Sequence, residues 1–288
     1  MNLEIIDEYT GPMLSSPQKV RIHHDHAFVA DLGGHRVSVF DLDANYVDQI
    51  GTGLIPSAAD LAIRDDRLLV SGTGYNIYEF DVSSSAFVSV TPVPSLNMRG
   101  MDIRPASMGE TVIADSGSHL LISLDTANSF VGTTGTSVAP VISNPGPRDF
   151  AQCQDVLIVD DPDYGEMMMV ADHQNRRIVA VVLDPKVAMV KMDPVDFDAA
   201  TITYDGPSNF RPTAIAYNRK TRTIFAVDGA GGDVWFVDMA SGSIAVGYNA
   251  FQIGAGQLSN PVGIAATDDV LAITDYGTNK IQTLKIDS

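Results

Sequence analysis

The sequence repeats one short pattern along its length: an apolar strand ending in Asp or Ser, a polar turn, and a second alternating strand. The pattern is clearest in residues 28–43, FVADLGGHRVSVFDLD, where Gly33 and Gly34 follow Asp31. Further copies occupy residues 68–83, 111–126, 168–184, 224–239 and 271–287. The residues that end the first strand are Asp31, Ser71, Asp115, Asp172, Asp228 and Asp275, at separations of 40, 44, 57, 56 and 47. Internal periods of about 40–50 residues are typical of β-propeller blades.

Further short strands flank these copies. Upstream strands, which carry a proline at or near their start, are expected at residues 16–22, 146–152, 211–217 and 260–266, and downstream strands at 46–53 and 243–249. Proline fits the start of a strand because its missing N–H breaks no ladder hydrogen bond there. Four strands per unit predict blades at residues 17–53, 57–93, 98–135, 147–205, 211–253 and 260–288.

The two ends of the chain complement each other. The last unit ends after three strands, whereas residues 3–11 match the pattern of the fourth strand at 45–53. An N-terminal strand that joined the last unit would close the ring and remove an open sheet edge. The sequence therefore predicts an all-β chain with a single domain over residues 1–288. We expect a six-bladed β-propeller with four antiparallel strands per blade, in which residues 3–11 close the last blade.

The segment VADLGGHRVSVFD at residues 29–41 resembles the NHL repeat, whose signature is a Pro-x-Gly inner strand, then Asp, a small turn, Asn-His-Arg and an alternating strand. The resemblance extends to residues 170–183 and 272–286. The position of the family's Arg is filled by Arg36, Asn76, Leu120, Arg177, Asp233 and Lys280. This resemblance implies a six-bladed propeller, a fold that hosts binding scaffolds as well as lyases and lactonases.

The charge of the chain restricts its partners. It has 36 acidic and 18 basic residues, and the acids are 31 Asp and only 5 Glu. Asp favours turns and Glu favours helices, so this choice agrees with a turn-rich fold. A net charge of −18 repels phosphate backbones, so we expect no nucleic-acid partner. No run of about 18 apolar residues occurs, so we expect no membrane span.

The N-terminus and the cysteine content bear on location and redox chemistry. Residues 1–11 carry acids where a signal peptide has a basic region, and no apolar stretch follows them. If the native chain begins here, we expect a cytoplasmic or assembly-associated protein without a signal peptide. The single Cys153 excludes an internal disulfide framework and a multi-cysteine zinc site.

Three arginines, in a chain with few basic residues, form the main candidate binding site. Arg99, Arg148 and Arg211 fall at the entrances of the inner strands of units three, four and five, so we expect them near one mouth of the central channel. Arginines there could bind a carboxylate or phosphate by charge-assisted hydrogen bonds. The remaining candidates at this mouth are His35, Arg36 and Asp149. Alternatively, the three arginines pair with Asp60, Asp102 or Asp149 and serve the fold alone.

Two segments resemble parts of metal sites. In a strand, His24 and His26 would share one face and could hold a transition metal. Asp161 and Asp163 precede Gly165 and match part of a calcium loop, but a further acid before this Gly and a Glu near the loop end are missing in register. The alternatives are an exposed turn at residues 23–26 and a hairpin turn at residues 161–165. No cofactor is predicted, and calcium or another divalent cation stays open.

Two functions from different classes fit these observations. The first is a non-catalytic, NHL-like scaffold that binds a protein partner or a small anionic ligand, alone or in a larger assembly. The second is a propeller enzyme of the lyase or lactonase type with its site at the channel mouth. A calcium-dependent lactonase-like centre typically uses Glu on the inner strands, and the equivalent entrances here contain none. The sequence favours the scaffold over the enzyme and identifies no catalytic residue. Insertions at residues 155–170 and 184–209 are expected to extend one rim of blade four.

Overall fold

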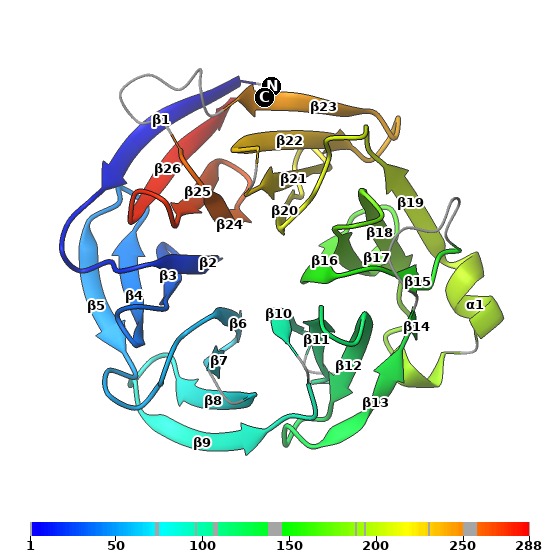
Figure 1. Ribbon diagram of the computed structural model, residues 1–288, viewed down its shortest axis with the longest axis horizontal. Helices are drawn as coiled ribbons and strands as arrows, with labels where there is room; N and C mark the ends of the chain where they lie inside the picture. Colours follow the sequence, from blue (N-terminus) through cyan, green and yellow to red (C-terminus); the bar gives the residue numbers. More distant parts are fainter. Residues whose placement is uncertain are drawn as a thin grey trace.

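A computed structural model describes residues 2–72, 75–95, 97–105, 109–137, 146–187, 189–192, 194–229, 231–249 and 258–287. Six four-stranded antiparallel sheets lie side by side around one axis, each with its innermost strand toward the axis (Figure 1). This is the predicted six-bladed β-propeller. Within the described residues, no helix is long and apolar enough to cross a membrane.

The blades follow the chain in order, each from its innermost strand outward. Blade one contains β2 (Pro17–His23), β3 (His26–Asp31), β4 (Arg36–Asp41) and β5 (Tyr46–Ile50). Blade two contains β6 (Asp60–Arg64), β7 (Arg67–Gly72), β8 (Asn76–Asp81) and β9 (Phe87–Pro92). Blade three contains β10 (Met98–Ile103), β11 (Thr111–Asp115), β12 (Leu120–Leu124) and β13 (Phe130–Thr134).

Blade four contains β16 (Cys153–Asp161), β17 (Gly165–Asp172), β18 (Arg177–Val182) and β19 (Thr201–Asp205). Blade five contains β20 (Ala214–Asn218), β21 (Thr223–Asp228), β22 (Asp233–Asp238) and β23 (Ile244–Asn249). Blade six contains β24 (Pro261–Ala266), β25 (Val270–Asp275), β26 (Lys280–Asp287) and β1 (Asn2–Tyr9). A short parallel pair, β14 (Thr136–Ser137) with β15 (Asp149–Phe150), lies between blades three and four.

The N-terminal strand closes the ring as predicted. β1 is the outer strand of blade six and runs antiparallel to β26, with Leu3 opposite Ile286 and Ile5 opposite Leu284 (Figure 1). Leu3 is 2% exposed and packs in one core cluster with Leu284 and Ile286. The first and last strands of the chain therefore share a sheet, and the burial of Leu3 stabilises that closure.

The Asp that ends the second strand of a blade ties the turn beside it to the loop that leads into the innermost strand. The Asp275 carboxylate accepts hydrogen bonds from the amides of Ser259 at 2.6 Å, Asn260 at 2.8 Å and Gly277 at 2.9 Å. Asp172 accepts one from the amide of Ala151 at 2.7 Å and pairs with Arg177 at 2.8 Å. The repeated Asp is therefore a structural residue, because a carboxylate that satisfies several backbone amides fixes the turn.

The two insertions lie in blade four. β16 and β17 have nine and eight residues, and the turn between them spans Pro162 to Tyr164. After β18 the chain forms a short 3-10 helix, η1 (Met189–Lys191), and the helix α1 (Pro194–Ala199) on the outer side of the ring (Figure 1). Phe197 of α1 is buried in the core cluster between blades three and four, which anchors this insertion to the ring.

Candidate functional site

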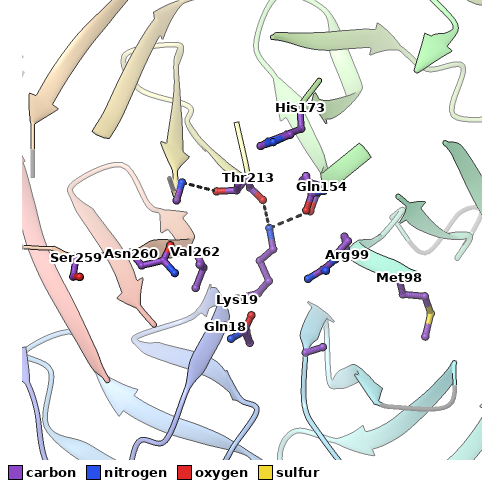
Figure 2. A pocket seen from close by; sticks show the side chains of 12 residues that line it. Gln18, Lys19, Met98, Arg99, Gln154, His173, Thr213, Ser259, Asn260 and Val262 are labelled. Atoms are coloured by element: carbon purple, nitrogen blue, oxygen red, sulfur yellow. Dashed lines mark hydrogen bonds between the residues drawn. The ribbon is translucent and has the colours of Figure 1, made fainter. Parts of the chain in front are cut away.

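Two cations of blade one reach the axis of the ring. Lys19 and Arg21 alternate on β2, so both side chains leave the same face of the strand. The Lys19 ammonium lies 3.3 Å from the Asp155 carboxylate and donates to the carbonyls of Gln154 at 3.2 Å and Thr213 at 2.5 Å (Figure 2). These partners belong to blades four and five, so Lys19 joins opposite sides of the ring.

Arg21 makes a second connection through the same carboxylate. Its guanidinium lies 3.2 Å from Asp155 Oδ1 and donates to the carbonyls of Met101 and Val156. Asp155 also accepts hydrogen bonds from the amides of Val156 and Ile215, each at 3.0 Å. Burial lowers the pKa of Lys19, although Asp155 opposes that shift. Burial acts the same way on Arg21, but Asp155 and further carboxylates outweigh it and raise its pKa.

Two further carboxylates complete a buried group that we call the axial cluster: Lys19, Arg21, Asp60, Asp102 and Asp155. Asp102 accepts hydrogen bonds from the amides of Ile103 at 2.8 Å and Ile158 at 2.7 Å. Asp60 is 1% exposed, and neither of its carboxylate oxygens has a hydrogen bond of normal geometry with a described residue. Burial raises the pKa of Asp60 to about 7, although Arg21 opposes that shift.

A pocket of about 540 Å³ lies where the innermost strands begin, and we call it the mouth pocket. Its lining residues come from all six blades: Gln18, Lys19, Ala59, Met98, Arg99, Gln154, His173, Thr213, Gly229, Ser259, Asn260 and Val262. Lys19, Arg99 and His173 surround the same space (Figure 2). No Asp or Glu is among the described residues that line it, although the chain has 36 acids.

The cationic groups of the mouth pocket differ in the hydrogen bonds and ion pairs that they already make. Lys19 already has three acceptors and contributes charge more than hydrogen bonds. Arg99 is exposed, and its guanidinium has no ion pair or hydrogen bond with any residue in the described part of the chain. His173 is half-buried, its Nδ1 lies 3.4 Å from the carbonyl of Pro212, and burial lowers its pKa. Arg99 is therefore the group best able to bind an incoming anion.

The three predicted arginines do not all meet at the mouth. Arg99 lines the pocket, whereas Arg148 and Arg211 are not among its described lining residues. Arg148 instead lies 2.9 Å from Asp198 of α1, so the blade-four insertion supplies its partner. Arg211 acts electrostatically on His173, a lining residue, without lining the pocket itself. The expected convergence of all three arginines on the pocket is therefore not observed, and Asp198 accounts for the position of Arg148.

The other predicted mouth residues serve turns. Arg36 lies 3.4 Å from Asp31 and donates to Gln49 at 2.9 Å. His35 occupies the turn before β4 with φ of 55°, and Asp149 accepts a hydrogen bond from the amide of Gly146 at 2.8 Å. None of the three lines the mouth pocket in the described structure.

The predicted metal residues have other partners. His24 is in the turn between β2 and β3, and its ring lies 4.1 Å from that of His23. His26 begins β3 beyond that turn. Asp161 accepts hydrogen bonds from Tyr217 at 2.5 Å and Arg222 at 3.1 Å, and Arg222 also pairs with Asp163. Within the described ranges, no three His, Cys, Asp or Glu gather as a metal site.

Sequence patterns did not single out Arg21 or Asp155, which are central to the axial cluster. The available signal was charge at alternate positions of an innermost strand, as in KVR at residues 19–21, where apolar residues are the rule. Lys19 and Arg21 at these positions find their shared carboxylate partner, Asp155, in another blade.

Comparison with known proteins bears on the fold. No protein-family model matches the sequence, and no curated protein matches it. Among solved structures, the chain is similar to the β-propeller domain of Cps50 (Swd1) from Myceliophteria thermophila. The TM-score is 0.66 and the identity is 11%, with 99% of this chain and 100% of that chain covered. At this identity the similarity shows the class of fold, a β-propeller.

Proposed function

We propose that this chain is a non-catalytic, NHL-like propeller that acts as a binding scaffold and takes an anionic group at the mouth pocket. The observation that carries the proposal is the pocket's lining. It holds Lys19 and Arg99 without any acidic side chain among the described residues, in a protein whose net charge is −18. The pairs Asp31–Arg36 and Asp172–Arg177 support the NHL-like reading, because they join the repeat's Asp to its Arg.

A carboxylate or phosphate is the chemistry that the pocket favours. A guanidinium with no carboxylate partner offers two parallel N–H donors to such a group. The Lys19 ammonium adds positive charge at the base of the pocket, which Asp155 behind it offsets in part. The volume of about 540 Å³ lies within the range of about 300–1,000 Å³ usual for small-ligand sites. The anionic group can belong to a small molecule or to an acidic side chain of a partner protein.

The test is calorimetric titration of purified protein with sulfate, inorganic phosphate, succinate, citrate and short peptides that carry one acidic group. Wild type should bind at least one of these, more weakly as salt is raised. Arg99→Gln should weaken binding about tenfold or more. Arg148→Gln is the matched control, because it removes an arginine that pairs with Asp198 outside the pocket.

The outcomes separate the two sources of the anion. Binding of a free anion assigns a small ligand, whereas binding of acidic peptides alone assigns a protein partner. Equal losses in Arg99→Gln and Arg148→Gln, or no binding by wild type, would overturn the proposed site.

A further inference from the structure

Asp60 differs from the two other carboxylates of the axial cluster. Asp102 and Asp155 each accept two backbone amides, one from the following residue and one from the next blade. Asp60 is just as buried, yet neither of its oxygens accepts a hydrogen bond of normal geometry from a described residue, and the Leu61 amide is the backbone group that acts on it. A buried carboxylate without hydrogen bonds disfavours its charged form, because the lost hydration is not replaced.

The charge of the cluster points the same way. Lys19 and Arg21 supply two positive charges, whereas Asp60, Asp102 and Asp155 supply three negative charges when all are ionised. Both buried cations form their ion pairs with Asp155, and Arg64 also acts electrostatically on Asp102. Among the described residues, Asp60 has neither an ion pair nor that added cation. Asp60 is the member with the fewest bonds to its charged form, so a proton is held most easily there.

Most other charged groups on the strands packed against β6 have partners among the described residues. Ser71 of β7 lies beside Asp60, and its hydroxyl accepts from the Asp60 amide at 2.9 Å. Arg64 of β6 donates to the carbonyl of Ile103, and Arg67 of β7 pairs with Glu79. On β3, Asp31 pairs with Arg36, and His26 stands at the opposite end of that strand. β10 also carries Arg99, which is exposed at the mouth pocket. The charges that act most strongly on Asp60 are those of Arg21, Asp155 and Lys19 in the axial cluster.

Asp60 and the mouth pocket share a residue. Lys19 lines the pocket and is also one of the two cations that act electrostatically on Asp60. Ala59, the residue before Asp60, lines the pocket as well. A negative charge bound at the mouth would therefore lie close enough to change the free energy of ionising Asp60.

We infer that the mouth pocket and Asp60 form one proton-linked unit, in which binding of an anion is accompanied by uptake of a proton from solvent onto the Asp60 carboxylate. This inference rests on the proposed function. The bound anion draws on the positive field of Lys19 that otherwise favours ionised Asp60, and it repels the Asp60 charge directly. By linkage, protonation of Asp60 must strengthen anion binding by the same factor. The carboxyl group's rise in pKa to about 7 puts this exchange near neutral pH.

His173 is the competing source of proton linkage, because its imidazole lines the same pocket and would attract an anion once protonated. The probe anion must itself keep one protonation state over the pH range of the experiment. Sulfate meets this condition and is therefore the anion to use. Sulfate affinity and proton uptake are measured by calorimetry in two buffers of different ionisation enthalpy, between about pH 6 and about pH 8. The proteins are wild type, Asp60→Asn and His173→Gln. Carboxyl-carbon NMR of wild type, with and without sulfate, reads the Asp60 titration directly.

For wild type, sulfate affinity should rise at least about fivefold from about pH 8 to about pH 6, with proton uptake. Asp60→Asn should keep sulfate binding and lose this uptake, and His173→Gln should retain it. Sulfate should also shift the Asp60 carboxyl titration to higher pH. Uptake that persists in Asp60→Asn, or vanishes only in His173→Gln, would overturn the inference while leaving the mouth site intact. If sulfate binds at no pH, the mouth site fails for this anion, and the proton linkage falls with it.

Discussion

The Lys19 ammonium of blade one lies 3.3 Å from the Asp155 carboxylate of blade four, and these blades face each other across the ring (Figure 1). Arg21 approaches the other oxygen of Asp155 at 3.2 Å. The centre of this propeller is therefore crossed by ion pairs. Sheet-to-sheet packing holds neighbouring blades together, and these pairs add a connection between blades that do not touch as sheets.

Removal of Asp155 should be costly for this reason. Asp155→Ala leaves two buried cations and the amides of Val156 and Ile215 without their shared acceptor. We expect the free energy of unfolding to fall by about 3–5 kcal/mol. Asp198→Ala is the control, since its pair with Arg148 is partly exposed and should contribute only about 0–1 kcal/mol. Chemical denaturation measures both, and equal losses would contradict the cross-ring role.

Closure by the N-terminal strand gives a second prediction. Leu3→Ala should lower the free energy of unfolding by about 2–5 kcal/mol, because it empties a buried position between Leu284 and Ile286. Ile6 on the same strand is 40% exposed, and Ile6→Ala should change stability far less. Deletion of residues 1–12 should lower the melting temperature markedly, because blade six then loses its outer strand. A truncated protein that melts with wild type would rule out closure by β1.

The architecture was predictable because its signals are local. An Asp at a strand end, glycines after it and an alternating strand recur within about 16 residues, a span over which turn chemistry acts directly. The copies 28–43 and 271–287 show this most plainly. The partner of residues 3–11 also followed from local pattern. The last unit had only three strands, and residues 3–11 formed a strand of the fourth type that belonged to no other unit.

The site was predictable only in part, because its contacts join residues far apart in sequence. Arg99 was identified from its place at a strand entrance, and it does line the mouth pocket. Arg148 has an equivalent place, yet Asp198, 50 residues later, pairs with it. Lys19 and Asp155 are 136 residues apart in the sequence. No sequence pattern within a single blade can predict that they form an ion pair. The partners of an insertion or of a cross-ring contact become neighbours only when the ring has closed.

The third prediction concerns the repeated turn. Asp275→Ala removes three backbone hydrogen bonds to a buried carboxylate, so it should lower the free energy of unfolding by about 2–4 kcal/mol. Ser71 is the equivalent residue of blade two and accepts one backbone amide at 2.9 Å. Ser71→Ala should therefore lower stability by about 1 kcal/mol. If the two variants unfold at the same denaturant concentration, the Asp does not have the anchoring role described above.

The last prediction is the effect of Asp60 on stability as a function of pH. The pKa of this carboxyl is raised from 3.8 to about 7 by burial, so between these values the folded protein keeps a proton that the unfolded chain releases. The stabilising contribution of that proton is complete below about pH 4 and is lost as pH rises through about 7. Asp60→Asn has no such titration. The variant should match wild type at about pH 4 and become more stable than wild type at about pH 8, by on the order of 1–4 kcal/mol. Asp81→Asn is the control, because hydrogen bonds from Ser84 and Ser83 lower the pKa of Asp81 and place its titration below this range. Denaturant unfolding at a series of pH values measures the differences. A constant gap between Asp60→Asn and wild type would show that Asp60 is ionised in the folded protein throughout, and that the axial cluster tolerates the Asp60 charge without a proton.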